Sequence, residues 1–202
     1  MNKILLTSNG FSTERIKKEF LMVLQNPATM SRAVIITTAS MEKEFSKNVI
    51  KTKKDFENMG IAQVDFFDFE IDNPRALKQY DVIYLNGGNP FQLLYWIKKR
   101  EGFEIFQELA DQETIFVGAS AGAMVLGENI KIANFFTPEM NTVKLKNFNA
   151  LGMIEELLFP HYEREDLFLD PKSRTIEQRI KEFETLSQSK ITRLRDDEFI
   201  IK

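Results

Sequence analysis

Residues 114–126 read TIFVGASAGAMVL, and this stretch decides the fold. Thr114–Ala119 is a short apolar run with β-branched residues, which predicts a buried strand, and the small residues from Ala121 onward predict a helix. The strand-to-helix junction, Gly118-Ala119-Ser120-Ala121-Gly122, matches the pattern G-x-S-x-G. Such a turn exposes the serine hydroxyl beyond the sheet edge and leaves no room for bulky neighbours. We interpret Ser120 as a candidate nucleophile, against the plainer interpretation of a tight packing turn.

The rest of the chain repeats this alternation of short apolar runs and amphipathic segments. The pattern predicts strands over 3–8, 32–38, 64–67, 81–85, 114–119 and 157–159, and a terminal hairpin over 191–202. It predicts helices over 12–25, 42–59, 91–100, 103–111 and 173–186, and one from residue 121. Near-continuous apolar strands alternating with helices indicate an α/β fold, with a mostly parallel sheet covered by helices on both faces. We expect one domain over 1–202.

Composition excludes several kinds of chemistry. The 202 residues include no cysteine and a single histidine, His161, so thiol catalysis, thiolate metal sites and a two-histidine metal site within one chain are excluded. We expect neither a metal nor a cofactor. The formal net charge of −3 argues against a nucleic-acid partner. No apolar stretch approaches the length of a membrane span, so we expect a cytoplasmic protein with no membrane contact.

Three segments should meet at the carboxyl edge of the predicted sheet, where ligands bind in such folds: 8–10, 86–90 and 118–122. Asn86-Gly87-Gly88-Asn89 follows a predicted strand, and its glycines permit close backbone approach to a ligand. The N–H groups of Gly88 and Ala121 would form a two-donor oxyanion hole. On its own, this loop would be interpreted as a helix-capping turn.

His161 is the only imidazole available as a base for Ser120. It follows Pro160 at the end of a predicted strand, and a serine needs a base to become nucleophilic near neutral pH. A third, acidic residue would orient the imidazole. Candidates for this acid are carboxylates on either side of His161, and composition does not choose among them: Glu128, Glu139, Glu155, Glu156, Glu163, Glu165 and Asp166.

Taken together, four motifs resemble the peptidase E family. They are Leu85-Asn86-Gly87-Gly88-Asn89, Gly118-Ala119-Ser120-Ala121-Gly122-Ala123, Phe159-Pro160-His161-Tyr162 and Glu177-Gln178-Arg179-Ile180. The resemblance runs through nearly the whole chain. It implies a class I glutamine amidotransferase-like fold, Ser120 as nucleophile, His161 as base, and Gly88 with Ala121 as oxyanion donors.

The resemblance also implies a third triad member and two substrate contacts. The segment Thr137-Pro138-Glu139-Met140-Asn141 is similar to the stretch in which the family carries an acid, which makes Glu139 the expected partner of His161. Asn89 and Ile176 are the expected substrate contacts. Members that cleave after an N-terminal aspartate carry arginine where this chain has Ile176, and isoleucine offers a carboxylate no donor. Strict aspartate specificity is therefore not expected.

We accordingly expect a serine peptidase that hydrolyses a dipeptide or short peptide through a Ser120-His161-Glu139 triad. Two alternatives stay open: a cyanophycinase-like hydrolase of a β-linked or isopeptide bond, and a non-catalytic binding module on the same fold. A general α/β-hydrolase esterase is disfavoured by the short chain and by the Asn-Gly-Gly-Asn loop.

Overall fold

The computed structural model describes residues 3–202, and a six-stranded sheet forms its centre. The strand order is β3-β2-β4-β5-β1-β8. All neighbours pair in parallel except β1 and β8, which are antiparallel. The bounds are β1 Ile4–Thr7, β2 Arg32–Ile36, β3 Gln63–Phe67, β4 Val82–Leu85, β5 Ile115–Ala119 and β8 Phe199–Ile201. The predicted mostly parallel α/β fold is therefore confirmed.

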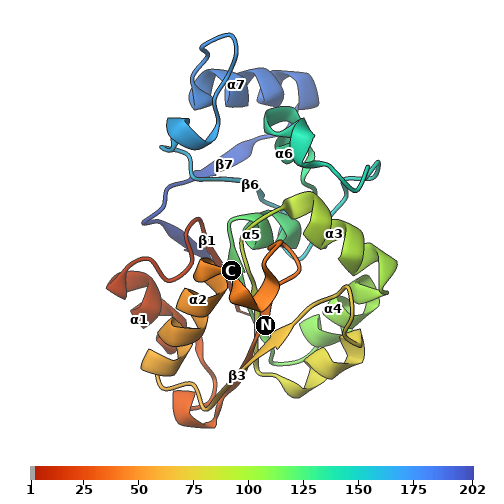
Figure 1. The fold of residues 1–202 in the computed structure, drawn as a ribbon. Helices are drawn as coiled ribbons and strands as arrows, with labels where there is room; N and C mark the ends of the chain where they lie inside the picture. Colours follow the sequence, from red (N-terminus) through yellow and green to blue (C-terminus); the bar gives the residue numbers. More distant parts are fainter. Residues whose placement is uncertain (1–2) are drawn as a thin grey trace.

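Helices cover both faces of this sheet (Figure 1). One face packs on α1 (Glu14–Val23) and α2 (Lys47–Asn58), whose apolar stripes join alternate strand residues in one buried cluster. The other face packs on α3 (Pro90–Lys99), α4 (Gly102–Ala110) and α5 (Ala121–Leu126) in a second, larger cluster. Because strand side chains alternate between the two faces, the same strands contribute side chains to both clusters.

A smaller unit lies beyond the carboxyl edge of the main sheet. It holds a second, two-stranded parallel sheet of β6 (Leu157–Pro160) and β7 (Ile191–Leu194), together with α6 (Lys131–Phe136) and α7 (Ile176–Ser187). Figure 1 shows these elements stacked above α5, the helix that begins directly after Ser120. This placement brings β6 and β7 to the candidate site.

The structure corrects two of the predicted elements. The chain after Lys190 is no hairpin, since β7 pairs in parallel with β6 while β8 pairs with β1 in the main sheet. The predicted helix 42–59 is a short 3₁₀ turn, Lys43–Phe45, followed by α2. Phe45 and Ile50, expected in its buried stripe, are 76% and 40% exposed, because Phe45 lies in the 3₁₀ turn and Ile50 lies beside the face of α2 that is buried. Within residues 3–202, no helix has the length and apolar character that crossing a membrane requires.

Candidate active site

Ser120 lies on the turn between β5 and α5, and its backbone is strained. Its φ and ψ angles are 50° and −112°, a conformation that non-glycine residues rarely adopt. The small neighbours are required sterically. A Cβ on Gly122 would lie 2.0 Å from the Leu85 carbonyl oxygen, and one on Gly118 would lie 2.7 Å from the Ala123 Cα. The turn therefore has the geometry that the G-x-S-x-G pattern predicts.

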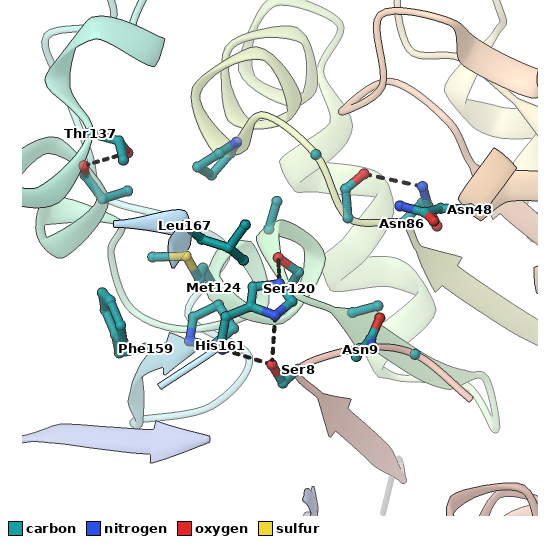
Figure 2. A pocket seen from close by; sticks show the side chains of 18 of the residues that line it. Ser8, Asn9, Asn48, Asn86, Ser120, Met124, Thr137, Phe159, His161 and Leu167 are labelled. Carbon is teal, nitrogen blue, oxygen red and sulfur yellow. Dashed lines mark hydrogen bonds between the residues drawn. The ribbon is translucent and has the colours of Figure 1, made fainter. Parts of the chain in front are cut away.

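His161 lies beside Ser120, at the end of β6. Its Nε2 is 3.0 Å from the Ser120 Oγ, so the two side chains share a hydrogen bond (Figure 2). His161 also has a positive φ, 58°, which turns the chain sharply after Pro160 and aims the imidazole at the main sheet. The structure thus brings together the two residues that the sequence pairs, although they are 41 positions apart.

The carboxylate next to the imidazole belongs to Asp196, and the prediction of Glu139 is wrong. Asp196 Oδ1 lies 2.6 Å from His161 Nδ1, and Asp196 follows β7 in the link to β8. Glu139 is exposed on the 3₁₀ turn Pro138–Met140. That turn is tied to the amino end of α3 by a 2.7 Å hydrogen bond from Asn89 Nδ2 to the Met140 carbonyl.

Asp196 is held in its charged form by its neighbours. Burial alone would raise the pKa of this carboxyl, but hydrogen bonds from Ser8 and His161, with the nearby positive charge of Arg164, bring its pKa below the ordinary value. The backbone of Asp196 is fixed as well: its N–H donates to Glu163 and its carbonyl accepts from Ser12. The carboxylate is therefore both charged and immobilised.

Ser8, a fully buried residue directly after β1, joins this group. Its hydroxyl donates to Asp196 Oδ1 at 2.8 Å and accepts from the His161 backbone N–H at 2.7 Å. The same oxygen lies 3.2 Å from His161 Nδ1 (Figure 2). Strand register explains the position, because Thr7 pairs with Ala119 and the next residues, Ser8 and Ser120, are neighbours at the sheet edge.

The loop Asn86–Pro90 forms the other side of the turn. Gly88 has a φ of 139°, and a Cβ there would lie 2.3 Å from the Ala39 carbonyl oxygen. Gly87 approaches Ser120 so closely that its Cβ would lie 3.2 Å from the serine Cβ. The predicted convergence of 8–10, 86–90 and 118–122 is confirmed, since all three segments line one cleft of about 350 Å³.

The structure places the two expected substrate contacts elsewhere. Asn89 caps α3, with its Oδ1 accepting from the N–H groups of Phe91 and Gln92, and it is not among the residues that line the cleft. Ile176 is 1% exposed in the core at the start of α7, and its N–H donates to Glu165. Neither side chain is positioned to touch a substrate in this cleft. Gly88 and Ala121, by contrast, both line it beside Ser120.

Sequence reasoning missed Ser8 and Asp196 as partners of His161. Each had a signal, because each comes at or just beyond the carboxyl end of a short strand. The prediction of a hairpin over residues 191–202 places Asp196 in a turn away from His161 and so hides its signal. In the structure Pro160 pairs with Leu194, so the residues that follow β7 come to lie beside His161.

Comparison with known proteins agrees with this fold. A crystal structure of a peptidase E-type protein from Listeria monocytogenes superposes with a TM-score of 0.77 at 23% identity, covering 100% of this chain and 98% of the other. A peptidase from an acI-B1 actinobacterium gives a TM-score of 0.72 at 18% identity, with coverage of 100% and 83%. At these sequence identities the similarity is one of fold alone. It places this chain in the class of α/β proteins with the peptidase E fold.

Sequence comparison then gives the family. The model of peptidase family S51 matches residues 4–201, and the chain belongs to that family. An uncharacterized peptidase of Listeria monocytogenes is 28% identical over 166 residues, 80% of this chain and 78% of the relative. Peptidase E of Shewanella sp. strain W3-18-1 is 34% identical over 108 residues, 52% of this chain and 44% of the relative.

Proposed function

We propose that this protein is a serine peptidase that hydrolyses dipeptides or short peptides, with Ser120 as nucleophile, His161 as general base and Asp196 as the residue that orients His161. One observation carries the proposal. An unbroken chain of hydrogen bonds runs from Ser120 Oγ through both nitrogens of the His161 ring to Asp196 Oδ1, at 3.0 and 2.6 Å. Nucleophile, base and orienting acid in this order form the arrangement that activates a serine.

In the proposed reaction, Ser120 Oγ attacks the carbonyl carbon of the scissile amide while His161 Nε2 accepts the hydroxyl proton. The C–N bond of the tetrahedral intermediate then breaks, and His161 gives that proton to the departing amine. A water molecule next attacks the acyl-serine ester with His161 again as base, which releases the carboxylate product and regenerates Ser120. Asp196, charged and fixed, stabilises the imidazolium that forms in both halves.

The backbone N–H groups of Gly88 and Ala121 are the proposed oxyanion donors. Ala121 is the first residue of α5, so its N–H has no acceptor within the helix. Gly88 lies in the neighbouring loop, directly after the Gly87 that approaches Ser120, in a conformation that favours glycine. Two such preorganised donors stabilise the negative charge that develops on the carbonyl oxygen; losing one donor in comparable enzymes costs roughly 10²–10³ in kcat.

The proposal is tested with Ser120→Ala and His161→Ala. Both should lower kcat/KM on any cleaved dipeptide by similar large factors, because the two residues act as one proton-transfer unit. Ser189→Ala is the matched control, since Ser189 lies in the turn between α7 and β7 and does not line the cleft. General-base help is worth roughly 10²–10⁴, so His161→Ala activity within about tenfold of wild type would contradict the mechanism.

A second measurement separates catalysis from mere binding. A fluorophosphonate probe should label Ser120 in the wild type, and labelling should be lost in Ser120→Ala and greatly slowed in His161→Ala. A chain that binds peptides without hydrolysing them, and whose Ser120 stays unlabelled, would instead be a binding module.

A further inference from the structure

The cleft has two sides of different chemistry, with Ser120 and His161 between them (Figure 2). On one side the lining is thioether, aromatic and aliphatic; we name this the apolar subsite, lined by Met124, Phe136, Phe159, Leu167 and Phe168. Three of its rings pack on one another, with the Phe136 centroid 4.4 Å from that of Phe159 and 5.9 Å from that of Phe168. These five side chains offer dispersion contact and no hydrogen-bond partner, and the Thr137 hydroxyl on the same side of the cleft already donates to the Ala133 carbonyl.

The opposite side carries more polar groups; we name this the polar side, and Asn9, Asn48, Lys51 and Thr52 line it beside the rings of Phe11 and Tyr84. Lys51 is the one cation among the described residues that line the cleft. It extends from α2, where its ammonium group also bonds Asp55 at 2.6 Å. Amide and ammonium groups here suit the free carboxylate of a short peptide.

A second cation, Arg179, lies behind the apolar subsite and does not line it. Its two terminal nitrogens donate to the carbonyl oxygens of Phe168 and Phe136, at 2.9 and 3.0 Å. Its guanidinium lies 3.9 Å from the centre of the Phe136 ring, and the side chain is 5% exposed. Arg179 therefore holds the apolar wall in place from outside, and its terminal nitrogens are already used.

This arrangement penalises a charged side chain in the apolar subsite. A substrate carboxylate placed there would lose its water and find no cation among the described lining residues on that side. An aliphatic or aromatic side chain would instead exchange water contact for the rings of Phe136, Phe159 and Phe168. The preference follows from what lines the cleft, whichever residue stands at position 176.

The geometry points to an apolar subsite for the residue that supplies the scissile carbonyl, with the carboxylate end of the peptide on the polar side. The preferred substrates are then dipeptides or short peptides with Leu, Phe or a similar side chain in first position. This inference rests on the proposed function, and it names the substrate class of the same site.

The test compares kcat/KM for Leu-Leu, Phe-Leu, Ala-Leu and Asp-Leu. Leu-Leu and Phe-Leu should exceed Ala-Leu by about tenfold or more, the scale on which an apolar pocket separates side chains of different size. Asp-Leu should be the poorest of the four. Equal or faster hydrolysis of Asp-Leu would overturn the inference, as would an apolar preference confined to the second residue.

A pair of variants tests the location. Leu167 lines the subsite and is 48% exposed, so Leu167→Arg places a guanidinium at the wall without burying it in the core. This variant should lower the Leu-Leu rate about tenfold or more and raise Asp-Leu relative to it. Leu169→Arg is the matched control, because Leu169 is 83% exposed two residues away and does not line the cleft. Identical profiles for the two variants would overturn the assignment.

Failure of this inference is distinguishable from failure of the proposed function. Suppose that Ser120 reacts with a fluorophosphonate but the four dipeptides show no apolar preference, or no hydrolysis. The specificity inference is then wrong, while the assignment of Ser120 as nucleophile is supported. If Ser120 does not react and no peptide is cleaved, the proposed function falls, and the substrate class falls with it.

Discussion

At the scale of single residues, Ser8 is the least expected member of the site. Its hydroxyl makes one hydrogen bond to the Asp196 carboxylate and one from the His161 backbone, so it couples the two residues that flank the imidazole. The His161 backbone needs such support, because its positive φ of 58° is costly for a residue with a side chain. We regard Ser8 as a positioning residue.

Ser8→Ala should therefore lower kcat by about 10–100-fold while KM changes little, since a hydrogen bond to a charged group is worth roughly 1.5–3 kcal/mol. The matched control is Ser12→Ala, which removes a 2.7 Å bond to the backbone carbonyl of the same Asp196 and leaves its carboxylate untouched. Steady-state kinetics of both variants give the measurement. Equal kcat losses in the two would show that Ser8 acts only by anchoring the loop.

The residues of the site differ in how far the sequence could reveal them. Ser120 is predictable because a steric requirement fixes its small neighbours, and His161 because no other imidazole exists in the chain. Asp196 is one carboxylate among 30 acidic residues, and only the register of β7 against β6 brings it to the ring. That register depends on pairing between distant segments, which local patterns do not encode.

At the scale of elements, the segment between Leu167 and α7 carries part of the apolar wall and is organised by Asp170. This carboxylate accepts hydrogen bonds from the backbone N–H groups of Lys172 and Arg174 and from the Arg174 guanidinium. These contacts, the Arg174 side chain foremost, hold the pKa of Asp170 well below its ordinary value. The segment has no regular secondary structure after Leu167, so this carboxylate supplies much of its order.

The depressed pKa gives the sign of a pH effect. A carboxyl whose pKa is lower in the folded than in the unfolded protein adds stability above the unfolded value, about 3.9, and loses it as pH falls toward the folded value. The Tm difference between wild type and Asp170→Asn should thus be constant near neutral pH and shrink below about pH 4. Thermal unfolding from pH 7 to pH 3 measures it, with the exposed Asp111→Asn as control. A difference that grows toward acid would contradict this account.

The error in the predicted hairpin has a physical origin at the element scale. Residues 191–194 and 199–201 are both strands, as expected, but the predicted hairpin required these two strands to pair with each other. Here β8 fills the free edge of β1, and β7 completes a separate sheet with β6. The strand propensity of each segment could be predicted from its sequence. The strand with which each one pairs depends instead on which sheet edges the rest of the fold leaves open.

At the scale of the whole molecule, the site joins two parts of unequal burial. Ser120 is attached to β5, which is buried throughout in the main sheet between two apolar clusters. His161 follows β6, which is also buried, but Asp196 follows β7, which is half-buried at its two central residues, and the sheet of β6 and β7 has only two strands. A two-stranded sheet with partly exposed residues opens at a lower free energy than a central sheet.

Activity should accordingly be lost before the fold is lost. In a urea titration, kcat/KM should fall at lower denaturant concentration than the far-UV circular dichroism signal, because opening of β6 and β7 removes His161 and Asp196 and leaves Ser120 in place. Hydrogen exchange should show β7 amides less protected than those of β4 and β5. Coincident activity and dichroism curves would mean that both sheets unfold as one unit.

The general architecture was the most predictable property of the molecule. Near-continuous apolar strands, alternating with amphipathic helices, leave few arrangements besides a parallel sheet covered on both faces. The placement of the smaller unit was not predictable in the same way. It depends on the irregular stretch from Glu128 to Ala150 and on contacts such as the hydrogen bond from Asn89 to the Met140 carbonyl. Hydrophobic periodicity in the sequence predicts neither of them.

The pairing of β1 with β8 also makes the chain suitable for circular permutation. Ile4 and Lys202 exchange backbone hydrogen bonds of 2.9 Å in both directions, because β1 and β8 are neighbours in the main sheet. A few added residues would join them into a ring, which could be reopened in the exposed turn 111–113, at the opposite end of β5 from Ser120. Such a circular permutant would carry the residues of its site in the order Ser120, His161, Asp196, then Ser8, on one unbroken stretch of polypeptide.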